Sequence, residues 1–383
     1  METRKLYYED CHLTRFEACV TSCRKEEKGY AVTLDATAFY PEGGGQACDL
    51  GTLGSARVLD VRERGDQIIH LCDSPLPAGE KVEGYIDYER RFDLMQQHTG
   101  EHIVSGVIHQ KWGYHNVGFH VGAELVTVDF DGMIPAEAIG WIEAEANRAV
   151  WEDLPVRCWY PREEELPHVG YRTKRELPWP VRVVEVPDTD KCACCGVHVS
   201  RTGEVGLVKI FSCVKFHQGV RMEMACGKRA FDYLSRAYEQ NRQVSQAFSA
   251  KVMETGEAAR RMNEQLAAEK FRANGLQKQV FAGIAKGYAN QADVLHFAPG
   301  LEPGQVRELA DAIAQCCDGT AAVLSETAPG RWSVCLASRS GDVKALGKAM
   351  SAALNGRGGG KPGFFQGSVE ATESQIWEFF RGR

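Results

Sequence analysis

The sequence predicts an α+β protein built of four parts, and three features of the chain lead to this prediction. The first ninety residues hold short apolar segments separated by turn formers, which is typical of a small N-terminal β-barrel. The next part mixes helical and strand patterns, as in a two-layer α/β domain. A proline-free, highly charged stretch then precedes a small C-terminal α/β region. The predicted parts are a barrel over 1–90, an α/β domain over 91–230, a helical arm over 231–290 and a C-terminal domain over 291–383.

The barrel is predicted from three short segments rich in Val, Ile and Leu, which are Gly29–Leu34, Ala56–Val61 and Gln67–Leu71. A glycine-rich motif, Thr37–Gln46, lies between the first two of them. The motif has two interpretations. It can be a flexible turn, or its three glycines can let the backbone approach a ligand closely while Thr37 and Gln46 supply polar contacts on either side.

The most informative pattern is a pair of short clusters of metal-binding side chains. His98 and His102 lie in a predicted helix over Arg90–Trp112, and Cys194 and His198 follow much later in the chain. Both pairs have i,i+4 spacing, which on a helix points two side chains to the same side. Two such pairs brought together offer three imidazoles and a thiol to one ion, and this donor set favours zinc.

The alternative interpretation is that these residues are ordinary buried thiols and a core histidine. It is weakened by the composition of the second cluster, where Cys192, Cys194, Cys195 and His198 lie within seven residues behind two aspartates. A zinc protease is also disfavoured, because the usual motif places a glutamate directly after the first histidine, where this chain has Thr99. The sequence therefore predicts a zinc site of another kind.

The rest of this domain is expected to contain a strand at Leu125–Phe130 and a helix at Pro135–Trp151. A segment rich in basic residues follows, with Arg162, Arg172, Lys174, Arg175 and Arg182. Such a run is usually a solvated face, although beside a metal cleft it can contact phosphates.

The arm is predicted from Lys228 to Tyr288, where proline is absent and apolar residues are set among charged ones. It is either one long helix or a helical hairpin, and Gly256 and Gly275 weaken a continuous coil. The C-terminal domain should hold strands and helices at Asp293–Phe297, Pro303–Cys317, Ala321–Leu324, Trp332–Ala337 and Asp342–Leu354. Its glycine-rich end, Asn355–Gly367, is either a floppy loop or a set of backbone donors and exposed aromatics suited to nucleic acid.

Composition restricts the class of protein further. The net charge of −7 argues against indiscriminate binding to polyanions, and no segment resembles a membrane span. The first residues lack the apolar core of a secretory signal, so a cytoplasmic location with reduced cysteines is expected.

In their order and spacing, the Thr37–Gln46 motif, His98xxxHis102 and Cys194xxxHis198 resemble the editing domain of alanyl-tRNA synthetases and the free-standing alanyl-tRNA editing proteins called AlaX. The resemblance covers roughly residues 1–230. The arm and the glycine-rich C-terminal domain resemble the C-terminal part of alanyl-tRNA synthetase, so the whole chain resembles the long form of AlaX.

The resemblance implies a trans-editing, zinc-dependent hydrolase that deacylates mischarged tRNA(Ala), mainly Ser-tRNA(Ala) and as a second substrate Gly-tRNA(Ala). No aminoacylation is expected, because the chain starts with the editing-type barrel. The expected partners are mischarged tRNA(Ala) and a second copy of the chain, through the arm or the C-terminal domain, but no membrane. The alternatives are a non-catalytic zinc-stabilised tRNA-binding protein and a zinc hydrolase of small esters or amides, which would not need the arm.

Carried over position by position, the resemblance assigns zinc binding to His98, His102, Cys194 and His198, and it places Thr37 and Gln46 at the editing pocket. An enzyme that spares the alanyl ester needs a polar partner for the seryl hydroxyl, since that partner is left unsatisfied by alanine. Thr37 is the candidate partner, and Gln46 is the candidate for orienting water or the ester. His198 is the ligand expected to be loosest.

Overall fold

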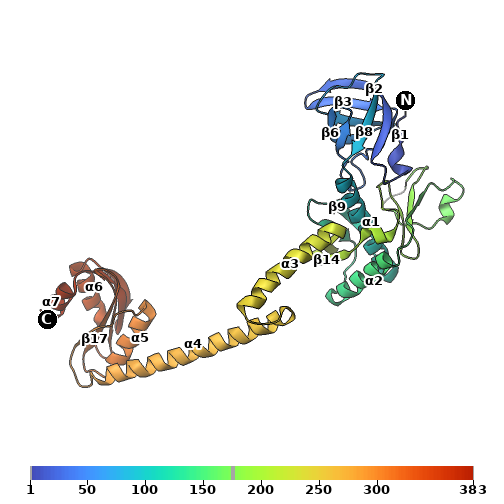
Figure 1. Ribbon diagram of the computed structural model, residues 1–383. Coiled ribbons are helices and arrows are strands. Elements are labelled where there is room, and N and C mark those ends of the chain that lie inside the picture. Colours follow the sequence, from blue (N-terminus) through green and yellow to red (C-terminus); the bar gives the residue numbers. More distant parts are fainter. Residues whose placement is uncertain (1, 174–176, 383) are drawn as a thin grey trace. The chain divides into compact units, whose positions relative to one another are not determined.

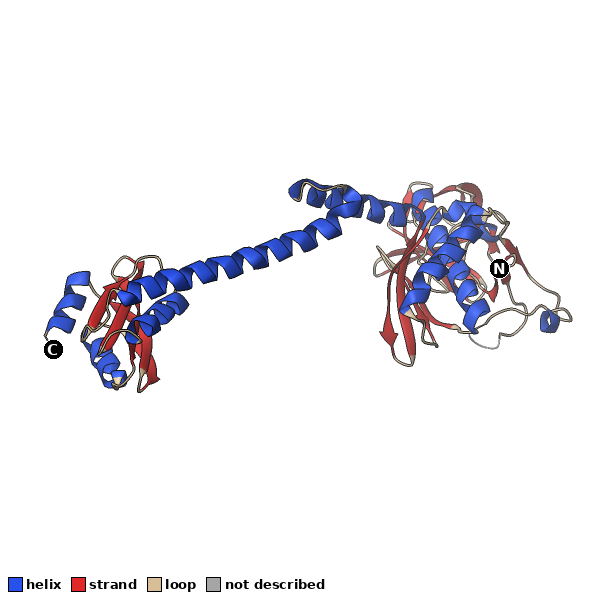
Figure 2. Ribbon diagram, turned by 90° about the horizontal axis from the view of Figure 1, so that it is seen from below, coloured by secondary structure: helices blue, strands red, loops and turns tan. Residues whose placement is uncertain are grey.

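The computed structural model describes residues 2–173 and 177–382. The chain divides into two compact units, Met1–Gln243 and Val244–Arg383, and Figure 1 traces their elements along the sequence. Each unit contains both helices and strands, as the colours of Figure 2 show, which confirms the predicted α+β class. None of the helices within the described ranges combines the length and the apolar character that crossing a membrane requires.

Six strands of the first unit pair in a closed circuit, in the order β2-β3-β7-β6-β5-β8, and so form a barrel. In chain order they are β2 (Arg15–Glu26), β3 (Gly29–Leu34), β5 (Gly51–Leu53), β6 (Ala56–Arg64), β7 (Gln67–Cys72) and β8 (Lys81–Ile86). Two short strands, β1 (Arg4–Lys5) and β4 (Ala36–Thr37), pair beside it. Buried and exposed residues largely alternate along β7, because successive side chains of a strand point to opposite faces. The interior is filled by Val32, Leu34, Phe39, Leu53 and Ile68.

Helix α1 (Tyr88–Trp112) follows the barrel and carries the first histidine pair. It begins where the Asp87 carboxylate accepts a hydrogen bond from the Arg90 backbone N–H at 3.2 Å. It ends at Gly113, which takes the left-handed conformation that closes many helices.

A buried ion pair connects α1 to the glycine-rich motif. The Arg91 guanidinium donates to the Asp49 carboxylate, with 2.8 Å between Nε and Oδ1, and also to the Ala38 carbonyl at 2.5 Å. Asp49 in turn accepts a hydrogen bond from the Tyr40 backbone N–H at 2.5 Å. Both charged side chains are fully buried, so this network fixes the motif against the helix.

The layer around α1 consists of a four-stranded sheet with the order β14-β15-β10-β9 and a three-stranded sheet with the order β11-β12-β13. Helices α1 and α2 (Ile139–Trp151) pack against each other and against the first sheet. The strands are β9 (Asn116–Val121), β10 (Val126–Phe130), β11 (Arg157–Trp159), β12 (Val183–Val186), β13 (Asp190–Ala193), β14 (Val208–Phe216) and β15 (Gly219–Cys226). Short 3-10 helices occur at Leu6–Tyr8, Ala136–Ala138, Leu166–His168, Thr202–Val205 and Val252–Glu254.

The stretch predicted as an arm forms two helices, α3 (Gly227–Ala247) and α4 (Thr255–Lys286). The chain leaves the helical conformation between them, where Ser249 has a positive φ of 49°. Helix α4 continues through Gly275, so that glycine does not break it.

The second unit contains a five-stranded sheet with the order β16-β17-β18-β20-β19 and three further helices. The strands are β16 (Val294–Phe297), β17 (Thr320–Ala328), β18 (Arg331–Ser338), β19 (Arg357–Lys361) and β20 (Phe364–Glu370), and the helices are α5 (Pro303–Ala314), α6 (Val343–Ala353) and α7 (Glu373–Arg381).

The glycine-rich end of this unit forms paired strands, which excludes the first of its two interpretations, a floppy loop. Gly358 and Gly360 lie in β19 and pair with Gly367 and Phe365 of β20. The side chain of Phe365 is buried in the core of the unit and is not an exposed aromatic, because it packs under α6.

Candidate metal centre

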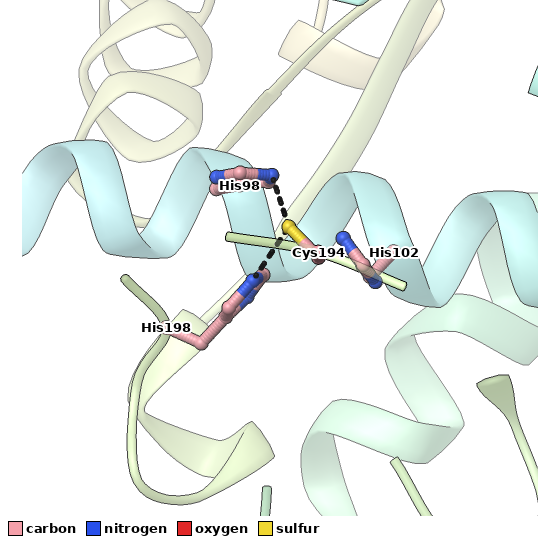
Figure 3. A group of neighbouring side chains, drawn as sticks. All are labelled: His98, His102, Cys194 and His198. Atoms are coloured by element: carbon pink, nitrogen blue, oxygen red, sulfur yellow. Dashed lines mark hydrogen bonds between the residues drawn. The ribbon is translucent and has the colours of Figure 1, made fainter. Parts of the chain in front are cut away.

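The structure brings the four predicted metal ligands together (Figure 3). One ligand atom from each of His98, His102, Cys194 and His198 lies within 4.8 Å of the others. The Cys194 Sγ is 3.4 Å from Nε2 of both His98 and His198. The first two histidines project from α1, and the other two residues come from the segment that follows β13.

The second ligand pair is not helical, which corrects the interpretation of its i,i+4 spacing. Cys194 and His198 lie in a loop whose shape is set by distant side chains. The Arg182 guanidinium donates to the carbonyls of Cys194 and Gly196 at 2.9 and 2.8 Å and lies over the ring of Tyr8, 4.4 Å from its centroid. The Tyr8 hydroxyl donates to a third carbonyl of the same loop at 2.6 Å.

Each imidazole is oriented by a hydrogen bond at Nδ1. The pairs are His98 with Gln46 Oε1 at 2.8 Å, His102 with Asp190 Oδ2 at 3.0 Å, and His198 with Thr99 Oγ1 at 3.1 Å. A ring that donates its Nδ1–H keeps the Nε2 lone pair for a metal, and metal-binding histidines are usually held in this way. The three imidazoles therefore present the nitrogen that a cation needs.

The charge of the cluster also suits a cation. Burial alone would raise the pKa of the Cys194 thiol, but the imidazoles of His98 and His102 hold that pKa well below its usual value. Burial lowers the pKa of His198 to about 3, so this ring is neutral. Burial alone would lower the pKa of His102, but the Cys194 thiolate and the Asp190 carboxylate hold it well above its usual value, so this ring carries a proton that a metal ion would replace.

Asp190 belongs to a neighbouring group with His102 and Cys192, whose ligand atoms also lie within 4.8 Å of one another. Both of its oxygens are already used. Arg172 donates to Oδ1 at 2.7 Å and to Oδ2 at 2.9 Å, and His102 shares Oδ2. Burial raises the pKa of Cys192 to about 11, so this side chain is a thiol. Asp190 therefore supports His102, and the four-residue cluster is the better metal site.

Three of the four cluster residues, His98, His102 and Cys194, line a cavity of about 650 Å³. Gly44 and Gly45 of the glycine-rich motif line the same cavity. A Cβ atom at Gly45 would lie 2.5 Å from the Phe119 ring, and the φ of +84° at this position also requires glycine. The backbone of the motif therefore lies close against the cavity wall, which favours the interpretation that its glycines let the backbone approach a ligand.

The structure places Gln46 and Thr37 in different environments. Gln46 is buried, its Oε1 holds His98, and its Nε2 is buried without a hydrogen-bond partner among the described residues. Thr37 is not among the residues that line the cavity. Its hydroxyl lies 2.8 Å from Nε2 of His70 and accepts a hydrogen bond from the Phe39 backbone N–H.

The predicted basic face is largely committed to internal contacts. Arg162 pairs with Glu165, while Arg172 and Arg182 support the metal cluster as described above. Lys174 and Arg175 lie outside the described residues. These three arginines therefore do not form a free cationic face for phosphates.

Sequence reasoning missed the importance of Glu101, a buried carboxylate that lines the cavity. Its position carried a signal. His98, Glu101, His102 and Ser105 recur at i, i+3, i+4 and i+7, so they share one face of α1. The order H-x-x-E-H is also the reverse of the usual zinc-protease motif and occurs in a second class of zinc peptidases.

Three known domain families match parts of the chain. They are tRNA synthetases class II (A) over residues 2–90, the threonyl and alanyl tRNA synthetase second additional domain over residues 181–221, and the DHHA1 domain over residues 290–381. The second match contains Cys194 and His198.

Individual relatives extend the similarity over almost the entire chain. The alanine–tRNA ligase of Thermofilum pendens is 33% identical over 97% of this chain and 43% of its own length. The alanyl-tRNA editing protein Aarsd1 of Mus musculus is 28% identical over 95% of this chain and 93% of its own length. The alanyl-tRNA editing protein AlaX-L of Pyrococcus horikoshii is 32% identical over 60% of both chains.

This chain is a relative of the long-form alanyl-tRNA editing proteins. The resemblance predicted from the sequence is thereby confirmed. The chain spans less than half the length of the alanine–tRNA ligases that it matches over nearly its full length, since it covers 42 to 44% of them.

Proposed function

We propose that this chain removes wrongly attached amino acids from tRNA(Ala) by hydrolysing their ester bond, acting mainly on Ser-tRNA(Ala) and secondarily on Gly-tRNA(Ala). The observation that carries the proposal is the cluster of three oriented imidazoles and one thiol group, of which His98, His102 and Cys194 line a 650 Å³ cavity. That volume suits an aminoacylated terminal nucleoside. The relatives of this chain that are named alanyl-tRNA editing proteins indicate the substrate class. We expect the reaction to take place in the cytoplasm.

Zinc is the ion that best fits the cluster, since it prefers nitrogen and sulfur ligands at a compact four-residue site. His98, His102, Cys194 and His198 would hold it, and when bound it supplies a Lewis acid that polarises an ester or water oxygen. The chain's own groups then position the reactants. The Gln46 Oε1 atom lies beside His98, and the Gln46 Nε2 group has no hydrogen-bond partner among the described residues.

The selectivity role that the sequence predicts for Thr37 remains a proposal. The hydroxyl of Thr37 is held by His70 and the Phe39 N–H, and the glycine-rich motif that begins at Thr37 reaches the cavity at Gly44. An effect of Thr37 on the choice between seryl and alanyl esters would therefore pass through the position of this motif.

The test is deacylation of seryl-, glycyl- and alanyl-tRNA(Ala) by zinc-loaded protein and by Cys194→Ala, with metal content measured in parallel. The proposal predicts rapid loss of the seryl ester, a spared alanyl ester, and the absence of both zinc and activity in the variant. Cys192→Ala is the matched control, because it removes a nearby thiol outside the four-residue cluster and should keep zinc.

The alternative is a non-catalytic, zinc-stabilised tRNA-binding protein. It predicts that wild-type protein binds zinc and tRNA but leaves all three esters intact. Full activity in a zinc-free Cys194→Ala protein would exclude the metal from the reaction.

A further inference from the structure

Glu101 is a buried acidic side chain beside the metal cluster, and the proposed hydrolysis gives it no role so far. Its residue surface is 3% exposed, and it lines the same cavity as His98 and His102. Burying a carboxylate is costly unless it is paired. The Arg172 guanidinium interacts electrostatically with this side chain, but it donates hydrogen bonds to Asp190.

The hydrogen bonds of Glu101 use only one of its two oxygens. Ser105 Oγ and Asn116 Nδ2 both donate to Oε1, and among the described residues no donor reaches Oε2. This arrangement also fixes the Asn116 amide, because turning it over would place its oxygen against the carboxylate.

Asn116 supplies a second unused acceptor. Its side chain lines the cavity, and its Oδ1 is buried with no hydrogen-bond partner in the described part of the chain. A buried acceptor without a donor costs free energy, so native proteins rarely keep one unless a ligand or water satisfies it. Glu101 Oε2 and Asn116 Oδ1 are thus two hydrogen-bond acceptors that match a positively charged group with several N–H donors.

We propose that Glu101 and Asn116 bind the protonated α-amino group of the aminoacyl ester. An ammonium group has donors only and carries the charge that neutralises the carboxylate. This inference rests on the proposed function and extends it. Seryl, glycyl and alanyl esters all carry this group, so the subsite does not choose among them; it selects a free amino group and rejects esters whose nitrogen is acylated, as in peptidyl-tRNA.

A general-base role is the competing interpretation of Glu101, by analogy with zinc peptidases of the H-x-x-E-H class. The unused Asn116 acceptor favours the ammonium site, because a base that activates water does not need a second acceptor beside it. The two roles predict different experiments. A base changes the rate for every ester, whereas an ammonium site changes the preference between free and acylated amines.

The test measures binding to zinc-loaded full-length protein by calorimetry, so that it does not depend on hydrolysis. The probes are adenosine analogues that carry serine in a non-hydrolysable 3′-amide, and the same compound without the α-amino group. Wild-type protein should bind the amine-bearing probe about 30-fold more tightly, which is the scale of a buried charged hydrogen bond. In Glu101→Gln this preference should fall to within about 3-fold, with zinc content and binding of the amine-free probe unchanged.

Glu63→Gln is the matched control, since Glu63 lines the same cavity but pairs with Lys5 at 2.6 Å. It should keep the preference. The proposal is overturned if wild-type protein shows no preference, or if Glu101→Gln keeps it while slowing hydrolysis of free and N-acetylated seryl esters alike. Should Glu101→Gln fail to fold, Asn116→Ala provides the second test, because it removes the acceptor and should reduce the preference. Preferential binding of the amine-bearing probe by a protein that hydrolyses no aminoacyl-tRNA would support this site and reject the proposed function.

Discussion

Proteins usually bury apolar side chains and expose polar ones, and helices α1 and α4 each depart from this rule in a different way. Helix α1 buries polar groups, among them Gln97, His98, Glu101, His102 and Ser105. Helix α4 exposes apolar ones, among them Met262, Leu266, Phe271, Leu276 and Val280. Polar groups inside a protein need partners, and apolar groups outside it need none. The comparison teaches that the buried polar face of α1 is a candidate ligand site, whereas the exposed apolar side chains of α4 by themselves say little about function.

The largest effect is expected where α1 depends on a buried charge. Asp49→Ala leaves the guanidinium of Arg91 buried without its carboxylate, which should reduce the free energy of unfolding by about 3–5 kcal/mol. Urea denaturation of the full-length protein measures it. As a control, Asp73→Ala removes an exposed ion pair with Arg57 and should cost no more than about 1 kcal/mol. Equal losses from the two variants would show that burial does not govern these pairs.

The second prediction concerns pH and the buried imidazole of His70. Burial lowers its pKa from 6.5 to about 4, so the folded protein keeps this ring neutral where the unfolded chain takes up a proton. Stability should therefore fall as the pH drops from 6.5 to 4, by about 3 kcal/mol in total, and then level off with respect to this group. A His70→Gln variant should lack this component of the pH dependence. Parallel stability profiles for the two proteins would contradict the prediction.

Thr37→Val is expected to have a smaller effect on stability. The change removes the hydroxyl next to His70 and the acceptor for the Phe39 N–H, which should cost about 1–3 kcal/mol. The sequence also predicts a lower ratio of seryl to alanyl kcat/KM. Deacylation assays decide this point, because a variant that loses stability but keeps the ratio would limit Thr37 to a structural role in the barrel.

The smallest effect is expected on the surface of α4. A double Leu266→Ser, Val280→Ser variant should change the stability of the chain by no more than about 0.5 kcal/mol, since both side chains are more than half exposed. Sedimentation at several concentrations shows whether wild-type protein self-associates and the variant does not, as the predicted homodimer through the arm requires. A large loss of stability in a monomeric protein would mean that this face is packed.

Local sequence patterns were sufficient for much of the barrel and for α1. The segment predicted as Gly29–Leu34 forms a strand with the same bounds, because its apolar residues and the turn formers around it are both local features. The helix predicted over Arg90–Trp112 ends where α1 ends but starts two residues after Tyr88, and the caps Asp87 and Gly113 that set these ends depend on neighbouring residues only.

Features that depend on distant contacts were not predictable in the same way. The i,i+4 spacing of Cys194 and His198 suggested a helix, but Arg182 and Tyr8 stabilise a loop there instead. The glycine-rich end was ambiguous because glycine has no side-chain pattern, and its pairing with β20 decided the outcome. Helix α7 was missed altogether, although Thr372 and Gln375 form a capping box at its start.

The hydrogen bonds that hold the loop of Cys194 and His198 bear on the order in which the protein folds and binds a metal. Its carbonyls are satisfied by Arg182 and Tyr8, and the rings of His98, His102 and His198 are oriented by bonds to other protein groups. These contacts do not depend on a metal, so the ion proposed for this site would bind after the chain has folded, unlike in zinc fingers, where the ion drives folding. On the proposed function, newly made molecules would be folded but metal-free at first, and the supply of metal rather than the rate of synthesis would set how many of them are active.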